Sequence, residues 1–139
     1  MELKRIYDIM LHYSERHPDQ KIALSGKIGK NKWNEYTPQL FKKTANELSC
    51  ALIAKGIQKG DKVAVISTNR PEWTITQMAV TQIGAVLVPI YPTITAEDYL
   101  YILNHCEAKL VIMEGEIVMR KIQSVADKLP GQIVPPAGV

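Results

Sequence analysis

The sequence predicts an α/β protein with a mainly parallel sheet flanked by helices, preceded by an N-terminal helix and a β-hairpin. Between Gly60 and residue 113, short apolar runs alternate with longer segments that begin at helix-capping residues, which is typical of repeated strand–helix–strand units. The run 63–66 (VAVI) lacks the alternation of a half-exposed strand. We therefore expect it to be buried on both faces, as in a parallel sheet.

Length and composition are those of one ordinary globular domain. The chain has 139 residues, enough to bury a core without disulfides or metals. Hydrophobic residues make up 46% and charged residues 22%, both near globular averages, which argues against a disordered or fibrous protein.

The N-terminal part predicts a helix followed by a hairpin. Apolar residues between Leu3 and Tyr13 recur at spacings of three and four, so we expect a helix that ends before the Pro18 that follows His17. Residues 22–24 and 33–36 have the composition of two strands, joined by an irregular turn rich in glycine and lysine.

Capping residues bound the second helix. Thr37 is expected as its N-cap and Pro38 as its first residue, where a missing N–H costs nothing. Gly56 should end it, because glycine tolerates the left-handed conformation that terminates helices. The apolar spacing places these residues on its inward face: Leu40, Phe41, Thr44, Ala45, Leu48, Ala51 and Leu52.

The next two helices have capping-box signals. Asn69 and Glu72 are three residues apart, so we expect Asn69 as the N-cap of a helix that begins near Arg70. Thr95 with Asp98 repeats the signal for the following helix.

The remaining elements complete the alternation. A strand over 85–88 is expected to end at Pro89, because proline cannot donate to the strand ladder. Residues 110–113 predict a further strand and 117–125 a last helix, while the prolines from Pro130 onward predict a short strand or a loose tail.

The basic residues are spread along the chain except for four lysines that gather at one place. Lys21, Lys27, Lys30 and Lys32 surround the hairpin turn, although the net charge is only +3. Nucleic-acid binders usually add aromatic or motif support on a charged face, so we expect no nucleic acid and a solvated hairpin tip. A nucleic-acid-binding domain that uses this turn is the weaker alternative.

The chemistry-bearing residues form no known catalytic arrangement. The glycine pair at 26 and 29 lacks the rest of a dinucleotide fingerprint, and no G-x-x-x-x-G-K-S/T loop occurs. The adjacent Glu97 and Asp98 suit the first turn of a helix. The three histidines have no further ligands at metal-binding spacing. We therefore predict no catalytic, cofactor-binding or metal residue in this chain.

Location follows from what the sequence lacks. No apolar run approaches the roughly 18 residues that span a bilayer, and no signal-peptide core follows Met1. Cys50 and Cys106 are expected to be buried thiols in a reducing compartment. We expect a cytoplasmic protein without a transmembrane segment, compatible with peripheral attachment to a membrane.

The segment from Gly60 onward resembles the adenylate-forming enzymes. These enzymes commonly carry G-D-x-V-x-x-x-x-x-N-x-x-E-W, then a helix, then G-A-x-x-V-P-I-x-P. Upstream, Trp33, Tyr36 and Leu40 fit the family's first hairpin and helix. The pattern is matched at twelve positions: Gly60, Asp61, Val63, Asn69, Glu72, Trp73, Gly84, Ala85, Val88, Pro89, Ile90 and Pro92.

The resemblance is strongest to the long-chain fatty-acid branch, the acyl-CoA synthetases, through residues 91–93 and 99–103. It implies a ligase that joins fatty acid and ATP into acyl-adenylate and pyrophosphate, after which coenzyme A displaces AMP, with Mg²⁺ accompanying ATP. The family's phosphate loop, nucleotide contacts and catalytic lysine come later in its chains. We therefore expect residues 1–139 to be a single N-terminal subdomain of the large domain, without the catalytic parts and inactive alone.

Within this resemblance, Ile90, Tyr91 and Thr93 are candidates for a wall of the acyl or CoA channel, and the helix caps are scaffold. The implied partners are the C-terminal continuation of the chain, fatty acid and CoA. A homo-oligomer could form through an exposed apolar face. The alternative is a free-standing α/β interaction module, which should lack such a face.

Overall fold

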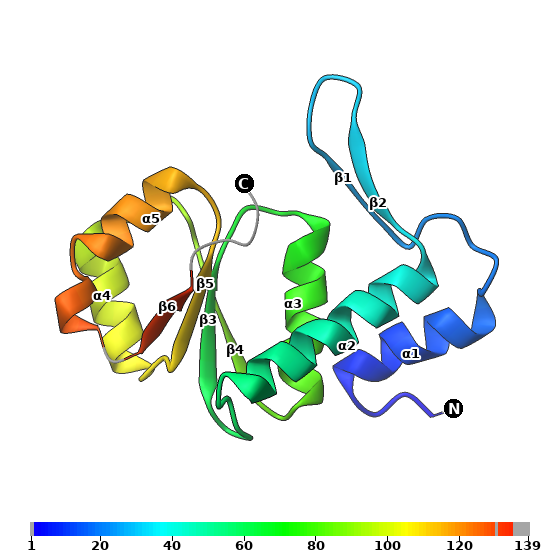
Figure 1. Cartoon of the computed structure of the whole chain (residues 1–139), viewed down its shortest axis with the longest axis horizontal. Helices are drawn as coiled ribbons and strands as arrows, with labels where there is room; N and C mark the ends of the chain where they lie inside the picture. The colour runs from blue at the N-terminus through cyan, green and yellow to red at the C-terminus, as the bar shows by residue number, and fades with distance from the viewer. Residues whose placement is uncertain (1, 130, 135–139) are drawn as a thin grey trace. The chain divides into compact units, whose positions relative to one another are not determined.

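The computed structural model describes residues 2–129 and 131–134, which form two compact units (Figure 1). The first unit contains the described residues up to Gly56 together with Asn69–Gly84. The second contains Ile57–Thr68 and the described residues from Ala85 onward. The chain therefore leaves the second unit once and returns to it.

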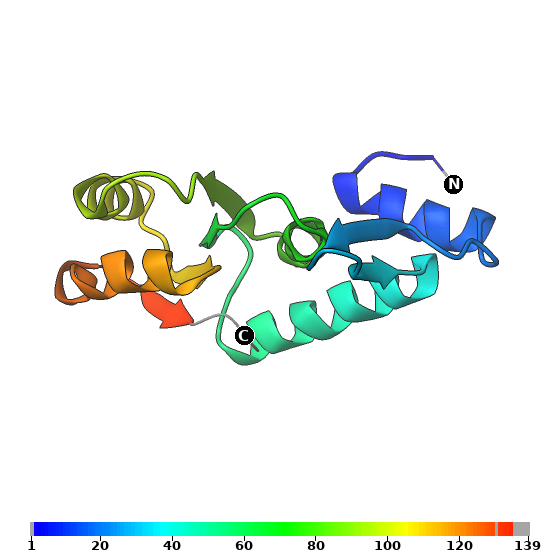
Figure 2. The ribbon, with the colours of Figure 1, turned by 90° about the horizontal axis from the view of Figure 1, so that it is seen from above.

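The first unit consists of three helices and a hairpin. Its elements are α1 (Ile6–Arg16), β1 (Leu24–Lys27), β2 (Trp33–Tyr36), α2 (Pro38–Ala54) and α3 (Pro71–Gln82). The three helices pack against one another (Figure 2), and β1 pairs with β2 in antiparallel register. The hairpin and all three helices were predicted within a few residues of these bounds.

The core of the first unit is formed by one side of each helix. Its buried residues are Met10, Phe41, Ala45, Ile75 and Met78, which come from α1, α2 and α3. Their spacing within α2 and within α3 places them on single helix faces, and burial of this apolar surface stabilises the unit.

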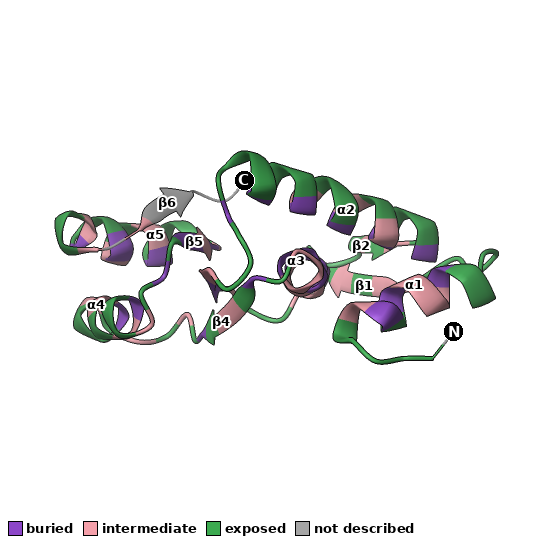
Figure 3. Cartoon of the chain, turned by 90° about the horizontal axis from the view of Figure 1, so that it is seen from below, coloured by how far each residue is buried: buried purple, intermediate pink, exposed green. Residues whose placement is uncertain are grey.

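The inward face of α2 differs from the one predicted. Leu40 and Ala51 are exposed, and the buried line includes Ser49. Figure 3 shows the buried stretches along one side of α2. Burial of Ser49 is permitted because its hydroxyl can donate its one hydrogen to the carbonyl oxygen of Ala45, at 3.0 Å, or of Ala79, at 2.9 Å. A pattern based on apolar residues alone does not include such a serine.

The second unit is built on a parallel sheet. Its strands are β3 (Lys62–Ile66), β4 (Val86–Ile90), β5 (Leu110–Met113) and β6 (Gln132–Val134), in the order β4-β3-β5-β6. Every described pair in this sheet is parallel. Of the short strand or loose tail expected at the C-terminus, a strand is present as β6. Pro130 and Pro135–Pro136, on which this expectation rested, lie outside the described residues.

Two helices cover one face of this sheet. They are α4 (Ala96–His105) and α5 (Glu116–Gln123), with a short 3₁₀ helix, η1 (Ala126–Lys128), after α5. Residues 63–66 are all buried, as their lack of alternation predicted. The helices and the sheet meet in one core: Ala64, Ile66, Ile90, Tyr99, Leu103, Ala108, Val111, Met113, Val118 and Ile122.

The prediction that Pro89 ends its strand is wrong. β4 continues to Ile90, and Pro89 lies opposite Val65 in the ladder. Because β4 is an edge strand of this sheet, some of its N–H groups point away from β3, and a proline can take such a position without breaking a pair.

The expectation of two buried thiols is also wrong. Cys50 is exposed and Cys106 is half-buried. On α2 the neighbouring Ser49 takes the buried position, which turns Cys50 outward. No described helix is both long enough and apolar enough to cross a membrane.

Candidate functional site

Open parallel sheets usually bind ligands at the carboxyl ends of their strands, so a site in the second unit is expected there. β3 is followed by Ser67 and Thr68, β4 by Tyr91, and β5 by Glu114. Since the strands are parallel, these residues lie at the same edge of the sheet.

Glu114 closes the end of β3. One of its carboxylate oxygens, Oε2, accepts hydrogen bonds from the hydroxyl of Ser67 at 2.8 Å, and from the N–H and hydroxyl of Thr68 at 2.9 and 2.7 Å. The N–H of Glu114 donates to the carbonyl oxygen of Ile66 at 2.8 Å. The hydrogen-bond donors of Ser67 and Thr68 at the carboxyl end of β3 are therefore already paired with the carboxylate of Glu114.

This arrangement does not fit an ATP phosphate group. A phosphate cradle needs N–H and hydroxyl donors that face the ligand, usually with a lysine. Here the donors of Ser67 and Thr68 already face Glu114, whose negative charge would repel a phosphate. No step of ATP chemistry is assigned to these residues.

The three channel candidates follow β4 in different environments. Ile90 is buried in the core of the second unit, whereas Thr93 is exposed and Tyr91 is 80% exposed. The loop is fixed at its backbone, because the hydroxyl of Tyr99 donates to the carbonyl of Tyr91 at 3.0 Å and the ammonium of Lys121 donates to that of Ile94 at 2.7 Å. Burial raises the pKa of Tyr99, which keeps its hydroxyl a neutral donor.

A second polar cluster surrounds Glu72 in the first turn of α3. Its carboxylate accepts hydrogen bonds from the amide of Asn34, from the hydroxyl of Tyr36 at 3.0 Å and from Nε of Arg70 at 2.8 Å. Burial raises the pKa of Glu72, but the hydrogen bonds from Arg70 and Tyr36 outweigh it and hold the pKa below its ordinary value. Burial raises the pKa of Tyr36. The cluster joins the hairpin to α3.

The predicted cap at Asn69 is wrong. Arg70 takes the N-cap position of α3 and makes no side-chain cap hydrogen bond. Glu72, expected in a capping box, is held by Asn34, Tyr36 and Arg70 instead. The capping prediction used only the spacing of Asn69 and Glu72, whereas the Glu72 side chain binds residues of the hairpin, which is distant in sequence. Asn34 and Tyr36 are two residues apart on β2, so their side chains lie on the same face of the strand. This spacing was the signal in the sequence that could have indicated a shared partner.

The other predicted caps lie at helix ends. The hydroxyl oxygen of Thr37 accepts a hydrogen bond from the N–H of Leu40 at 3.1 Å. Thr95 and Asp98 form a reciprocal capping box at the start of α4, with both backbone-to-side-chain distances at 3.2 Å. Gly56 follows α2 with φ of 86°. These residues act on helix boundaries.

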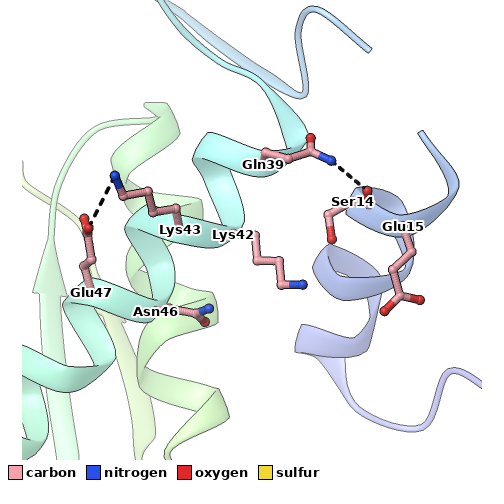
Figure 4. Close-up of a pocket in the computed structure, with 7 residues that line it drawn as sticks. All are labelled: Ser14, Glu15, Gln39, Lys42, Lys43, Asn46 and Glu47. Carbon is pink, nitrogen blue, oxygen red and sulfur yellow. Dashed lines mark hydrogen bonds and ion pairs between the residues drawn. The ribbon is translucent and has the colours of Figure 1, made fainter. Parts of the chain in front are cut away.

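A pocket of about 380 Å³ lies between α1 and α2 (Figure 4). Its lining carries two lysines and two glutamates, so it favours neither an anion nor a cation, and Gln39 donates to the carbonyl of Ser14 at 3.0 Å across it. The lining residues are Ser14, Glu15, Gln39, Lys42, Lys43, Asn46 and Glu47.

Comparison with known proteins decides the family. Residues 11–135 match the model of the AMP-binding enzymes. This chain belongs to the AMP-binding enzyme family. The match includes the first unit from Leu11 onward and the described part of the second.

Relatives in the AMP-binding family include fatty acyl-CoA synthetase A of Dictyostelium discoideum, which is 34% identical over 99 residues, 71% of this chain and 14% of that protein. The long-chain-fatty-acid–CoA ligase FadD15 of Mycobacterium bovis is 35% identical over 89 residues, 62% of this chain and 15% of that protein. A solved structure of a Mycobacterium tuberculosis fatty acyl CoA synthetase superposes with a TM-score of 0.79 at 25% identity, covering 97% of this chain and 26% of that one.

Several AMP-binding pattern residues have structural roles in this chain. Gly60 and Gly84 have φ values of 88° and 77°, in the left-handed region that favours glycine. The carboxylate of Asp61 accepts hydrogen bonds from the N–H of Gln58 at 2.7 Å and from Nζ of Lys109 at 2.8 Å, and the Lys109 contact chiefly lowers its pKa. Gly60, Gly84 and Asp61 therefore shape the turns that lead into strands of the sheet.

Proposed function

We propose that residues 1–139 form an N-terminal subdomain of the large domain of a long-chain fatty-acid:CoA ligase, and that they serve there as scaffold. The activity of the whole enzyme is the conversion of fatty acid, ATP and CoA into acyl-CoA, AMP and pyrophosphate. The single observation that carries this proposal is the family match over residues 11–135, joined by relatives whose names describe fatty acyl-CoA synthetases.

The scaffold role is supported by what the described polar groups do. Glu72, Asp61 and Glu114 each accept hydrogen bonds from groups of their own unit. ATP and Mg²⁺ would be held by parts of the enzyme beyond this chain, which spans 14% and 15% of the two relatives described above. CoA and fatty acid are the substrates of the whole enzyme in this proposal.

The loop after β4 is the part that we propose to face substrate. Tyr91 is 80% exposed and Thr93 is exposed, while the backbone beside them is held by Tyr99 and Lys121. Such a fixed loop can present side chains to an acyl or CoA channel. Ile90 would support the loop from the core.

The remaining parts of the proposal concern partners and location. The main partner is the rest of the enzyme chain, which would cover exposed apolar residues such as Ile9 and Ile53, 55% and 57% exposed. Without it, these residues would favour self-association into a homo-oligomer. We place the enzyme in the cytoplasm, with peripheral association with membranes.

Fatty-acid-dependent exchange of pyrophosphate into ATP tests this proposal. The chain alone should give no exchange above a blank without protein, and it should restore exchange to a relative's enzyme from which the matching segment has been deleted. The deleted enzyme alone is the control. Exchange by the isolated chain, in material free of intact enzyme, would contradict the scaffold role.

A further inference from the structure

The turn of the β1–β2 hairpin combines exposed apolar and basic side chains. Trp33 is 55% exposed and Ile28 is 53% exposed, and Lys27, Lys30 and Lys32 are exposed beside them. Lys27 lies opposite Trp33 in the register, and cross-strand partners project from the same face. The exposed end of the hairpin therefore has an apolar and a cationic component together.

The base of the hairpin is held against α3, so the exposed side chains at its turn stay on the surface. Gly26 lies directly against the ring of Pro71, and the inward-facing Asn34 and Tyr36 bind Glu72. The turn itself is closed by a hydrogen bond from the N–H of Ile28 to the carbonyl of Lys32 at 2.9 Å. Figure 1 shows the turn extending away from α2.

The charge of this turn is uncompensated within the described residues. None of its three lysines has an ion pair with a described residue. From Gln20 to Tyr36, Glu35 is the one acidic residue against four lysines. The hairpin therefore has a local positive charge that a negatively charged surface would match.

We propose that this turn docks on the surface of a lipid bilayer that contains anionic lipids. Trp33 and Ile28 would enter the headgroup region, where indole rings are favoured because they are apolar with one polar N–H. Lys27, Lys30 and Lys32 would lie against the acidic headgroups while their methylene stems contact the apolar boundary. Apolar burial and charge attraction together give interfacial binding.

A membrane accounts for the turn better than a nucleic acid does. Phosphate contacts would use the lysines, and one base could stack on Trp33, but Ile28 would gain nothing from a phosphate backbone. A bilayer surface uses all of these side chains at once. This turn would serve the membrane association in the proposed function, on which its role rests, and vesicle binding can be measured without ligase activity.

Binding to vesicles tests the proposal on the chain itself. Vesicles of phosphatidylcholine with about 30% phosphatidylserine should sediment the wild-type chain, and vesicles of phosphatidylcholine alone should bind it at least roughly tenfold more weakly. Raising the salt should weaken binding to the anionic vesicles, because the attraction is screened. Equal binding to both vesicles, or none to either, would overturn the proposal.

Charge variants locate the surface. Replacing Lys27, Lys30 and Lys32 with glutamine should weaken binding to the anionic vesicles by on the order of a hundredfold, since each of the three lysines near such a surface contributes roughly fivefold. A matched control removes the same charge elsewhere, through glutamine substitutions at Lys55, Lys59 and Lys128. The control should retain binding within about twofold. Equal losses in the two variants would show that only net charge matters and would overturn the assignment.

Tryptophan fluorescence tests the depth of insertion. Brominated lipids in the vesicles should quench the wild-type chain, and Trp33→Phe should remove most of the quenching while Trp73→Phe should not. Circular dichroism of each variant checks that it is folded. Quenching that persists in Trp33→Phe, or tight binding of the wild-type turn to DNA without binding to vesicles, would contradict a membrane-docking turn.

Discussion

The carboxylate of Glu72 accepts a hydrogen bond from the hydroxyl of Tyr36 at 3.0 Å, although the two residues are 36 positions apart. The same carboxylate binds Asn34 on the same strand and Arg70 beside it. Glu72 therefore fixes the hairpin to the first turn of α3, and a pattern residue of the family acts as a tertiary connection.

Replacing Glu72 with glutamine should destabilise the chain by about 2 kcal/mol, because charge-assisted hydrogen bonds from three donors are weakened or lost. Urea denaturation measures the change. Glu116→Gln is the matched control, since Glu116 makes an exposed pair with Arg120 and should have little effect. Equal effects of the two substitutions would contradict the role of Glu72.

The effect of Glu72→Gln should depend on pH. The pKa of Glu72 is lower in the folded chain than its ordinary value, so its contribution is fully present above the ordinary pKa of the unfolded chain and is lost as pH falls through the folded pKa. The difference in unfolding free energy between wild type and Glu72→Gln should therefore shrink on acidification from neutral pH. A difference that grows instead would show that the folded pKa is raised.

Gly26→Ala should destabilise the hairpin by about 1 to 3 kcal/mol, because an added Cβ would overlap the ring of Pro71. Gly29→Ala is the matched control, since its nearest neighbour would be Cβ of Lys32 at 3.8 Å, an ordinary contact. Thermal unfolding of both variants compares them. If Gly26→Ala were as stable as Gly29→Ala, the close packing of β1 on α3 would be wrong.

Substitution by alanine should lower the free energy of unfolding by different amounts at Thr95 and at Asn69. Thr95→Ala should cost about 1 kcal/mol, because it removes the capping box at the start of α4. Asn69→Ala should cost less than about 0.5 kcal/mol, because Arg70 and not Asn69 is the N-cap of α3. Denaturation midpoints measure both, and a larger loss at Asn69 would support the capping role predicted from the sequence.

Local signals in the sequence predicted hydrogen bonds only where no distant residue competes for the same group. The three-residue spacing of Thr95 and Asp98 predicted their mutual hydrogen bonds. The same spacing of Asn69 and Glu72 gave a wrong cap, because Asn34 and Tyr36 of the hairpin bind Glu72. Ser67 and Glu114 are 47 positions apart, and their contact depends on the parallel pairing of β3 with β5. The effect of Pro89 likewise depends on tertiary structure, because proline disrupts an inner strand but is tolerated on an edge strand such as β4. The position of β4 in the sheet could not be predicted from the sequence.

The scaffold role in a fatty-acid:CoA ligase is tested most directly by a chimaera. The segment of Dictyostelium fatty acyl-CoA synthetase A that matches this chain is replaced by the corresponding residues of this chain, and acyl-CoA formation is measured beside the parent enzyme. We predict activity within roughly tenfold of the parent, because the segment supplies folded support and no catalytic group. A chimaera that is folded and binds ATP, yet forms no acyl-CoA, would contradict the account.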